Sequence, residues 1–320
     1  MKTFYDIRYR AYNQNCKKPL CFFLASDIHF SPSITSETLG KIASAAKSKH
    51  PDYIIIPGDL IDYLDAIDSN HELLRLLSWL ENLGEIAPTI IGLGNHDFYR
   101  INHNQKPKFF GRYPWKIENP APIIGQINSL TNVHLLNNST YEDNRVYIFG
   151  FTQSPDYYNL ADSSDTNMAI KDRSIMLHDL REIPSKLLSN LPKNKVKIAL
   201  IHSPFHLFDE EISAYFDNFD FTISGHSHNG AVPPILNDFW RSDRGISAPG
   251  NAKLFPEHAR AGLYGNHIIC GAATTISNSA RKLKFLNAAF PINIATLELD
   301  KSPLHARKPD IHKKYESFNH

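Results

Sequence analysis

The chain has 320 residues, with 34 lysines and arginines against 33 aspartates and glutamates, and 42% of it is hydrophobic. This composition supports a sizeable core, and its charge balance excludes a charge-driven affinity of the whole molecule for nucleic acids or membrane surfaces. The three cysteines have no paired spacing, the N-terminus is charged, and no long apolar run follows, so we expect a cytoplasmic protein with reduced thiols, no signal peptide and no transmembrane segment.

The first part of the chain predicts alternating strands and helices. Segments that pattern as strands, the first at a sheet edge, lie at 4–10, 20–25, 53–56 and 89–93. Helices are predicted at 36–49 and 70–83, the second stopping at Gly84. Because right-handed βαβ crossovers build parallel sheets, the C-terminal ends of the last three strands should meet at one edge.

A basic and aromatic stretch at 98–116 interrupts this alternation. Its five basic residues precede the first acidic residue, Glu118, and are Arg100, Lys106, Lys108, Arg112 and Lys116. We expect a long loop, either a solvated surface excursion or a cap over the strand ends that contacts an anionic or amphipathic substrate.

The second part predicts a further set of elements. Helical segments are expected at 123–130, 174–190 (broken at Pro184) and 207–218, with an irregular polar segment at 157–167. Strands are expected at 133–136, 145–151, 196–201, 219–224, 235–240, 267–274 and 292–299, the first two in antiparallel pairing. We therefore expect one α/β domain over 1–300 with two stacked sheets and flanking helices, a cap insertion at 98–120 and a mobile tail at 301–320.

Side chains able to bind metals follow five of the predicted strands. They are Asp27 and His29, Asp59, Asn95 with His96 and Asp97, His202, and His226 with His228. Carboxylate oxygen and imidazole nitrogen suit first-row divalent cations such as Mn, Fe, Zn or Co. The pairs at 27/29 and 226/228 would each lie on one side of an extended backbone, and Gly94 would allow a sharp turn. Even without His96 and Asp97, the seven remaining candidate ligands are too many for one tetrahedral ion, so two cations bridged by a carboxylate are the better count.

These motifs, in this order, resemble those of the calcineurin-like metallophosphoesterases. They occur as Asp27-Ile28-His29, Gly58-Asp59, Gly94-Asn95-His96-Asp97, His202 and Gly225-His226-Ser227-His228. Weaker similarity at 248–250, 254–256 and 262–264 resembles the bacterial subgroup of UDP-diacylglucosamine diphosphatases and related phosphodiesterases. The resemblance implies a four-layer αββα sandwich, in which two mixed β-sheets are flanked by helices.

The resemblance also implies a role for each motif residue. The first metal would be held by Asp27, His29 and His228, the second by Asn95, His202 and His226, with Asp59 bridging them. A metal-bridging hydroxide would attack phosphorus, with manganese the first choice of metal and Fe, Zn or Co the alternatives. His96 would stabilise the transition state or protonate the leaving oxygen, and Asp97 would orient its ring. We expect His134, His206, His258 and His267 to be structural.

Departures from the motifs narrow the expected substrate. The second motif runs from Asp59 through Asp62 into Tyr63-Leu64 without the Arg-Gly of protein Ser/Thr phosphatases, which disfavours a protein phosphatase. The bacterial diphosphatase subgroup more often has Thr and Gly-Gly at the positions that Ser227 and Asn229-Gly230 occupy here. We expect a small or lipid-linked phosphodiester or pyrophosphate as substrate, with a broad phosphomonoesterase and a silent metal-binding scaffold as alternatives. No dedicated nucleic-acid-binding module is visible, and peripheral membrane contact stays open.

Overall fold

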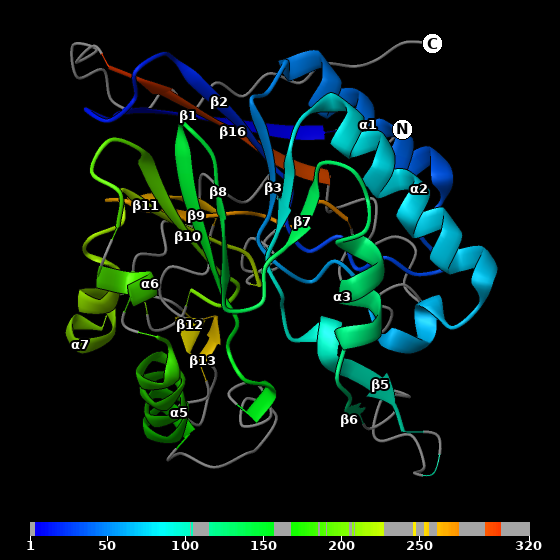
Figure 1. Cartoon of the computed structure of the whole chain (residues 1–320). Coiled ribbons are helices and arrows are strands. Elements are labelled where there is room, and N and C mark those ends of the chain that lie inside the picture. Colours follow the sequence, from blue (N-terminus) through cyan, green and yellow to red (C-terminus); the bar gives the residue numbers. More distant parts are fainter. Residues whose placement is uncertain are drawn as a thin grey trace.

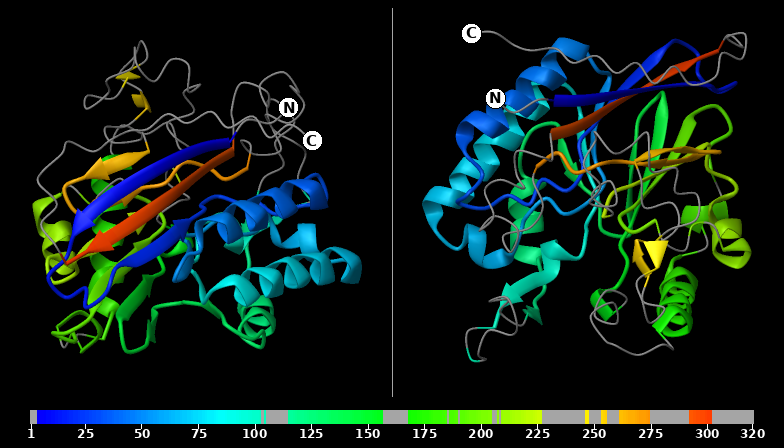
Figure 2. Two further views of the ribbon diagram at one scale, coloured as in Figure 1. Left: turned by 90° about the horizontal axis from the view of Figure 1, so that it is seen from above. Right: turned by 180° about the vertical axis from the view of Figure 1, so that it is seen from behind.

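The computed structural model describes residues 4–102, 104, 115–156, 168–184, 186–189, 191–204, 207, 209–226, 246–247, 253–255, 261–274 and 292–301. Two six-stranded mixed sheets stack face to face, and helices cover the outer face of each (Figures 1 and 2). The fold is therefore mixed α/β with the αββα layers implied by the sequence motifs.

The first sheet has the order β1-β16-β2-β3-β4-β7. Its strands are β1 (Phe4–Tyr12), β16 (Ile292–Asp300), β2 (Leu20–Leu24), β3 (Tyr53–Ile56), β4 (Thr89–Ile91) and β7 (Val133–Leu135). The strands β2, β3 and β4 are parallel, as predicted, and β7 joins them in parallel, while β16 runs antiparallel to β2 and parallel to β1 (Figure 2). The helices α1 (Ser36–Lys49), α2 (Asn70–Ile86) and α3 (Ala121–Ile127) lie on one side of this sheet (Figure 1).

The second sheet has the order β14-β15-β11-β10-β9-β8. Its strands are β14 (Gly262–Tyr264), β15 (His267–Ile269), β11 (Phe221–Ser224), β10 (Val196–Ile201), β9 (Val146–Phe151) and β8 (Ser139–Glu142). The four inner strands are parallel, and an antiparallel strand closes each edge. Residues of α5 (Met168–Glu182) and α7 (Glu210–Ser213) pack on its outer face, and α6 (Lys186–Ser189) lies next to them (Figure 1).

Smaller elements complete the described chain. They are the 3-10 helices η1 (Leu64–Ile67), η2 (His96–Phe98) and η5 (Ala214–Phe216), and the strand pairs β5 (Tyr99–Ile101) with β6 (Trp115–Ile117) and β12 (Ile246–Ser247) with β13 (Lys253–Phe255). The described part of the predicted cap at 98–120 thus includes an antiparallel strand pair.

The alternation of side chains along each strand explains why the apolar stretches are continuous. In β2, Phe22 and Leu24 pack between the two sheets, whereas Phe23 packs under the helices. In β3, Ile55 faces the other sheet and Ile54 faces the helices. A strand buried on both faces has no solvent side on which polar residues would be favourable.

The helix starts follow the capping signals in the sequence. The Thr35 hydroxyl accepts the backbone N–H of Thr38 at the start of α1, and Ser69 does the same for Glu72 at the start of α2. Each side chain satisfies one of the amide donors that a helix N-terminus leaves without an intrahelical partner. These caps fix the direction in which the chain leaves the loops after β2 and β3.

The prediction that Gly84 ends the second helix is wrong. The helix continues through it to Ile86, and Ala87 forms the C-cap. A Cβ atom at Gly84 would lie 2.6 Å from the Thr131 carbonyl oxygen, so the glycine lets α2 approach the loop before β7. Gly84 therefore allows the helix and the loop to pack closely, and it does not end the helix.

One further expectation, the antiparallel pairing of the strands at 133–136 and 145–151, is wrong, and other expected segments lie outside the described residues. Strands β7 and β9 do not pair with each other, because β7 joins the first sheet beside β4 while β9 joins the second between β8 and β10. The segments expected at 157–167 and 235–240, and the tail from residue 302, lie outside the described residues.

Within the described ranges, no helix combines the length and apolar composition that crossing a bilayer requires.

A pair of helical glycines tests this packing. Gly84→Ala should lower the free energy of unfolding by about 1–3 kcal/mol, because its methyl group would press on the Thr131 carbonyl. Gly40→Ala, in α1, should raise it by about 0.5–1 kcal/mol, because a methyl group there meets nothing within 4 Å and reduces the entropy of the unfolded chain. Urea denaturation measures both, and equal effects of the two substitutions would contradict the packing described.

Candidate metal centre

The predicted ligands that the structure describes gather where strands of both sheets end. Asp27 and His29 follow β2, Asp59 follows β3, and Asn95 and His96 follow β4. From the second sheet, His202 follows β10 and His226 follows β11. His228, the remaining predicted ligand, lies outside the described residues.

The loops after β2 and β3 run side by side and carry unusual backbone angles. Asp27 donates its backbone N–H to the Gly58 carbonyl (3.2 Å), and His29 donates to the Asp59 carbonyl (2.9 Å). Asp27, His29, Asp59 and His226 have left-handed φ angles of 54°, 46°, 51° and 65°. Non-glycine residues adopt this region at an energetic cost, and such strain clusters at functional sites.

These angles contradict the prediction that Asp27 and His29 lie on one side of an extended backbone. Asp27 and His29 do come together, but they are not on one side of an extended strand, because both have left-handed backbones. Gly94 differs from expectation as well. It has no left-handed φ, and it is needed because a Cβ atom there would overlap the carboxylate and backbone nitrogen of Asp59.

The carboxylate of Asp59 lies at the centre of the cluster and is only 1% exposed. Its Oδ2 atom lies 3.6 Å from Nε2 of His29 and 3.1 Å from Nε2 of His202. Its Oδ1 atom accepts the backbone N–H of His96 at 2.9 Å. One carboxylate thus contacts residues from the ends of β2, β4 and β10.

Two groups of metal-ligating atoms share this carboxylate. Asp27, His29 and Asp59 form one group and Asp59, His202 and His226 the other, with the ligand atoms of each group within 4.8 Å of one another. Asn95 joins the second group, because its Oδ1 lies 3.0 Å from Nδ1 of His226. Oxygen and nitrogen donors at this density, in a buried place, fit divalent first-row cations.

Burial and mutual charge set the proton affinities in the metal-free centre. Burial favours a raised pKa for Asp59, but His202, His96 and His29 together hold it well below its usual range. Burial lowers the pKa of His202, and the charge and hydrogen bond of Asp59 outweigh this and raise it to about 9. Burial raises the pKa of Asp27. This raised pKa favours the protonated form of His202 at neutral pH, and a cation that bound to its ring nitrogen would have to displace the proton.

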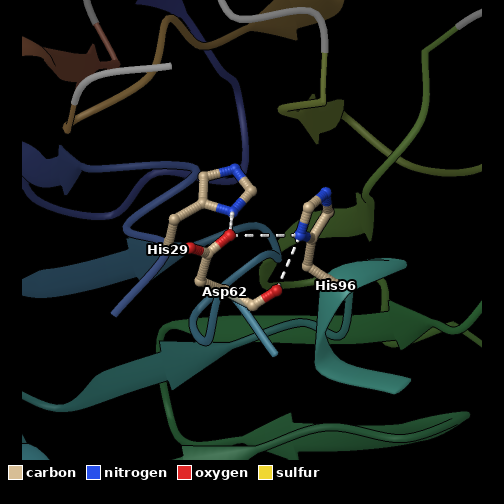
Figure 3. Close-up of side chains that lie close together, drawn as sticks. All are labelled: His29, Asp62 and His96. Carbon is tan, nitrogen blue, oxygen red and sulfur yellow. Dashed lines mark hydrogen bonds and ion pairs between the residues drawn. The ribbon is translucent and has the colours of Figure 1, made fainter. Parts of the chain in front are cut away.

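A third cluster adjoins the first group and includes a residue absent from the expected site. Asp62 Oδ1 lies 3.6 Å from Nδ1 of His29 and 3.5 Å from Nδ1 of His96 (Figure 3). His96 also donates from Nδ1 to the Asp62 carbonyl oxygen at 2.8 Å. Burial lowers the pKa of His96, while the charge of Asp59 and the hydrogen bond to Asp62 raise it to about 9.

Asp97 does not occupy the place expected for it. Its Oδ1 accepts the backbone N–H of Ile61 at 2.9 Å and its Oδ2 accepts that of Gly94 at 2.8 Å. The carboxylate of Asp97 therefore joins the loop after β3 to the loop after β4. Asp62 instead places its carboxylate 3.5 Å from Nδ1 of the His96 ring. Both aspartates follow a motif glycine closely, and spacing along the chain alone does not distinguish which of them faces the histidine.

Other candidate residues lie apart from this cluster. Arg100, in the predicted cap, contacts Asp68 at 2.6 Å and Glu118 at 2.8 Å. The His134 ring packs at a tilt against Tyr141, and His267 shares a 2.7 Å hydrogen bond with Thr222. Both contacts agree with structural roles for these histidines, while His206 and His258 lie outside the described residues.

The family model named calcineurin-like phosphoesterase matches residues 22–230, which include every motif of the centre. The chain belongs to this family. The match confirms the family resemblance that the sequence motifs indicated.

Two curated relatives carry the same domain. An uncharacterized metallophosphoesterase of Campylobacter jejuni is 26% identical over 223 residues, which is 69% of this chain and 47% of the relative. A zebrafish (Danio rerio) transmembrane protein with a metallophosphoesterase domain is 35% identical over 79 residues, 24% of this chain and 16% of the relative. The chain thus spans less than half the length of these relatives. Neither match tests the resemblance to the bacterial diphosphatase subgroup, which stays a prediction.

Two solved structures are similar at low identity. The TT1561 protein of Thermus thermophilus is 14% identical with a TM-score of 0.37, covering 65% of this chain and 82% of its own. A dimetal phosphatase from Danio rerio is 13% identical with a TM-score of 0.41, covering 79% and 87%. These likenesses are too distant to add to the family assignment.

The raised pKa of His202 predicts that cation binding releases protons. Because the imidazole must lose its proton to bind a cation, affinity for Mn²⁺ should rise by about tenfold per pH unit from pH 7 and level off above about pH 9. Calorimetric titration of the metal-free protein in buffers of different ionisation enthalpy measures the protons released. An affinity that does not change between pH 7 and 9, with no proton release, would contradict this electrostatic description.

Proposed function

We propose that this protein hydrolyses a phosphodiester or pyrophosphate bond of a small or lipid-linked substrate at a centre of two divalent cations. The observation that carries the proposal is that two groups of ligand atoms share the single carboxylate of Asp59. A bridging carboxylate is the arrangement that lets two cations lie about 3.5–4 Å apart and act on one phosphoryl group.

Each cation has a proposed set of ligands. The first would be held by Asp27, His29 and His228, the second by Asn95, His202 and His226, and Asp59 would serve both. When bound, such cations lower the pKa of water and offset negative charge on the phosphoryl oxygens. Manganese is our first choice, because the donors are carboxylate, imidazole and amide groups without thiolate, and Fe, Zn and Co are alternatives.

His96 is the proposed acid beside the leaving oxygen. Its side chain is 16% exposed, in contrast to the fully buried His29, so substrate can reach it. Its Nδ1 is held by Asp62, and the other ring nitrogen points away from Asp62 (Figure 3). The hydrogen bond and the charge of Asp62 raise the pKa of His96 and so favour the protonated ring that the proposed acid needs. Asp62, and not Asp97, is therefore the residue that we propose to orient His96.

Charge near the centre favours a monoanionic substrate group. A phosphomonoester carries up to two negative charges at neutral pH and a phosphodiester carries one. The two positions after the second motif are filled by Tyr63, which is half-buried, and Leu64, which is buried, instead of Arg-Gly. Arg100, from the predicted cap, is engaged with Asp68 and Glu118. These features support a phosphodiesterase or pyrophosphatase over a protein phosphatase.

The organisation and location of the protein are also proposals. We propose one catalytic domain over residues 1–300 with a cap at 98–120. A reducing cytoplasmic location is supported by Cys16, Cys21 and Cys270, which are free thiols in the structure, Cys16 and Cys270 being buried.

The shared carboxylate gives the first test of this function. The wild type with Mn²⁺ should hydrolyse bis(p-nitrophenyl) phosphate faster than p-nitrophenyl phosphate. Asp59→Asn should lower kcat by at least about 10²-fold, because it removes the negative charge common to both ligand groups. Asp68→Asn, at an exposed aspartate that pairs with Arg100, is the matched control and should retain activity. A folded, metal-loaded protein inert toward a broad panel of phosphoesters would refute the proposal. A faster reaction with p-nitrophenyl phosphate than with bis(p-nitrophenyl) phosphate would indicate a phosphomonoesterase instead.

Adjacent residues of one motif should separate into two phenotypes. His96→Asn should lower kcat by about 10²–10⁴-fold while both cations remain bound, because the residue transfers a proton and ligates neither cation. Asn95→Ala should instead weaken one of the two cations. Elemental analysis and calorimetry with Mn²⁺ measure occupancy, and steady-state kinetics at saturating Mn²⁺ measure kcat. Loss of a cation in His96→Asn would contradict the assigned roles.

A further inference from the structure

The loop that carries Asp27 and His29 is held on one side by the second motif. Its backbone N–H groups at Asp27, His29 and Phe30 donate to the carbonyls of Gly58, Asp59 and Leu60. Because Asp27 and His29 both adopt left-handed angles, the peptide at Ile28 between them must be fixed for both side chains to keep their directions. These hydrogen bonds hold the loop through its N–H groups, and its carbonyl groups need other partners.

The carbonyl side of the same loop is held by a segment far along the chain. Thr274 donates its hydroxyl to the Ile28 carbonyl oxygen at 2.6 Å, and the same hydroxyl lies 3.4 Å from the Asp27 carbonyl oxygen. The neighbouring Ala273 donates its backbone N–H to the Ser26 carbonyl at 2.7 Å. Thr274 is 3% exposed and Ile28 is fully buried, so water does not replace these bonds readily.

The segment that bears Thr274 joins the two sheets at the metal centre. The backbone N–H of Cys270 donates to the Ser224 carbonyl at the end of β11. Ala272 forms a β-bridge with Ser26, and its carbonyl accepts the backbone N–H of Asn293 in β16. The same end of β11 leads to His226, whose backbone N–H donates to the Asp27 carboxylate at 3.0 Å. A shift of residues 270–274 would therefore be transmitted to the first ligand group from both sheets.

We propose that Thr274 is a positioning residue of the first cation site, where its hydroxyl fixes the Ile28 peptide so that Asp27 and His29 face the same cation. This inference rests on the proposed function and deepens it. Thr274 lies beyond residues 22–230, the range that the family model matches, so the inference extends the metal centre to a part of the chain outside that match. Side chains that orient metal ligands without touching the metal alter metal affinity by about 10–100-fold when they are removed.

The test compares two substitutions at Thr274 with one at a similar buried threonine. Thr274→Val removes the hydroxyl at nearly constant shape, and Thr274→Ser keeps it. Thr89→Val is the matched control, because Thr89 is fully buried and its hydroxyl donates to the Ala87 carbonyl at 3.1 Å, at the end of β4 opposite Asn95. Each variant is titrated with Mn²⁺ by calorimetry, and its unfolding midpoint is measured without metal.

We expect Thr274→Val to weaken one of the two cations by about 10–100-fold and to leave the other unchanged. Thr274→Ser should bind both cations as the wild type does, and Thr89→Val should lower the unfolding midpoint without changing either affinity. If Thr274→Val does not fold, Thr274→Ala replaces it with the same expected ratio.

The possible failures are distinguishable. Wild-type affinities for both cations in a folded Thr274→Val, or equal weakening of both cations, would overturn the positioning role and leave the proposed function intact. A wild-type protein that binds none of Mn²⁺, Fe²⁺, Zn²⁺ and Co²⁺ would overturn the proposed function itself.

Discussion

The buried carboxylate of Asp59 is the constraint on which the rest of the site depends. An ionised carboxylate away from water costs several kcal/mol unless nearby groups compensate its charge. Here the compensation comes from His29, His202 and the backbone N–H of His96, which lie on three different loops. The two sheets must therefore bring their strand ends together at one place. Without a cation the raised pKa of His202 favours a proton that offsets the charge of Asp59, and in the proposed active state cations take the place of that proton.

The two stacked sheets bring these strand ends together, and the loops after the strands contain strained backbone angles. The core between the sheets aligns the ends of β2, β3 and β4 with those of β10 and β11, so neither sheet alone holds a complete ligand set. Four of the proposed ligand residues then adopt left-handed angles, which the surrounding hydrogen bonds must enforce. These hydrogen bonds come from two distant parts of the chain. The carbonyls of Gly58 and Asp59 accept the N–H groups of the loop at Asp27, and the hydroxyl of Thr274 donates to the carbonyl of Ile28 in the same loop. This explains how a residue far along the chain can affect a motif near its beginning.

Much of this arrangement follows from the sequence, and the exceptions have physical reasons. Continuous apolar stretches predicted β2, β3 and β4 because both of their faces are buried, and the parallel order of these strands predicted that the polar ends converge. Strand β8 was missed because its Ser139–Glu142 sequence is polar and partly exposed at a sheet edge. The contact of Asp62 with His96 was also missed, because the choice between two nearby carboxylates depends on how two loops pack together. The position of β16 between β1 and β2 depends on a pairing across nearly the whole chain, which local patterns do not encode.

The central claim is that one carboxylate serves two cations, and crystals grown with Mn²⁺ test it most directly through anomalous scattering. We predict two peaks about 3.5–4 Å apart on either side of Asp59, one near Asp27 and His29 and the other near Asn95, His202 and His226. A single peak, or a cation bound among His29, Asp62 and His96 in place of the pair, would contradict the account.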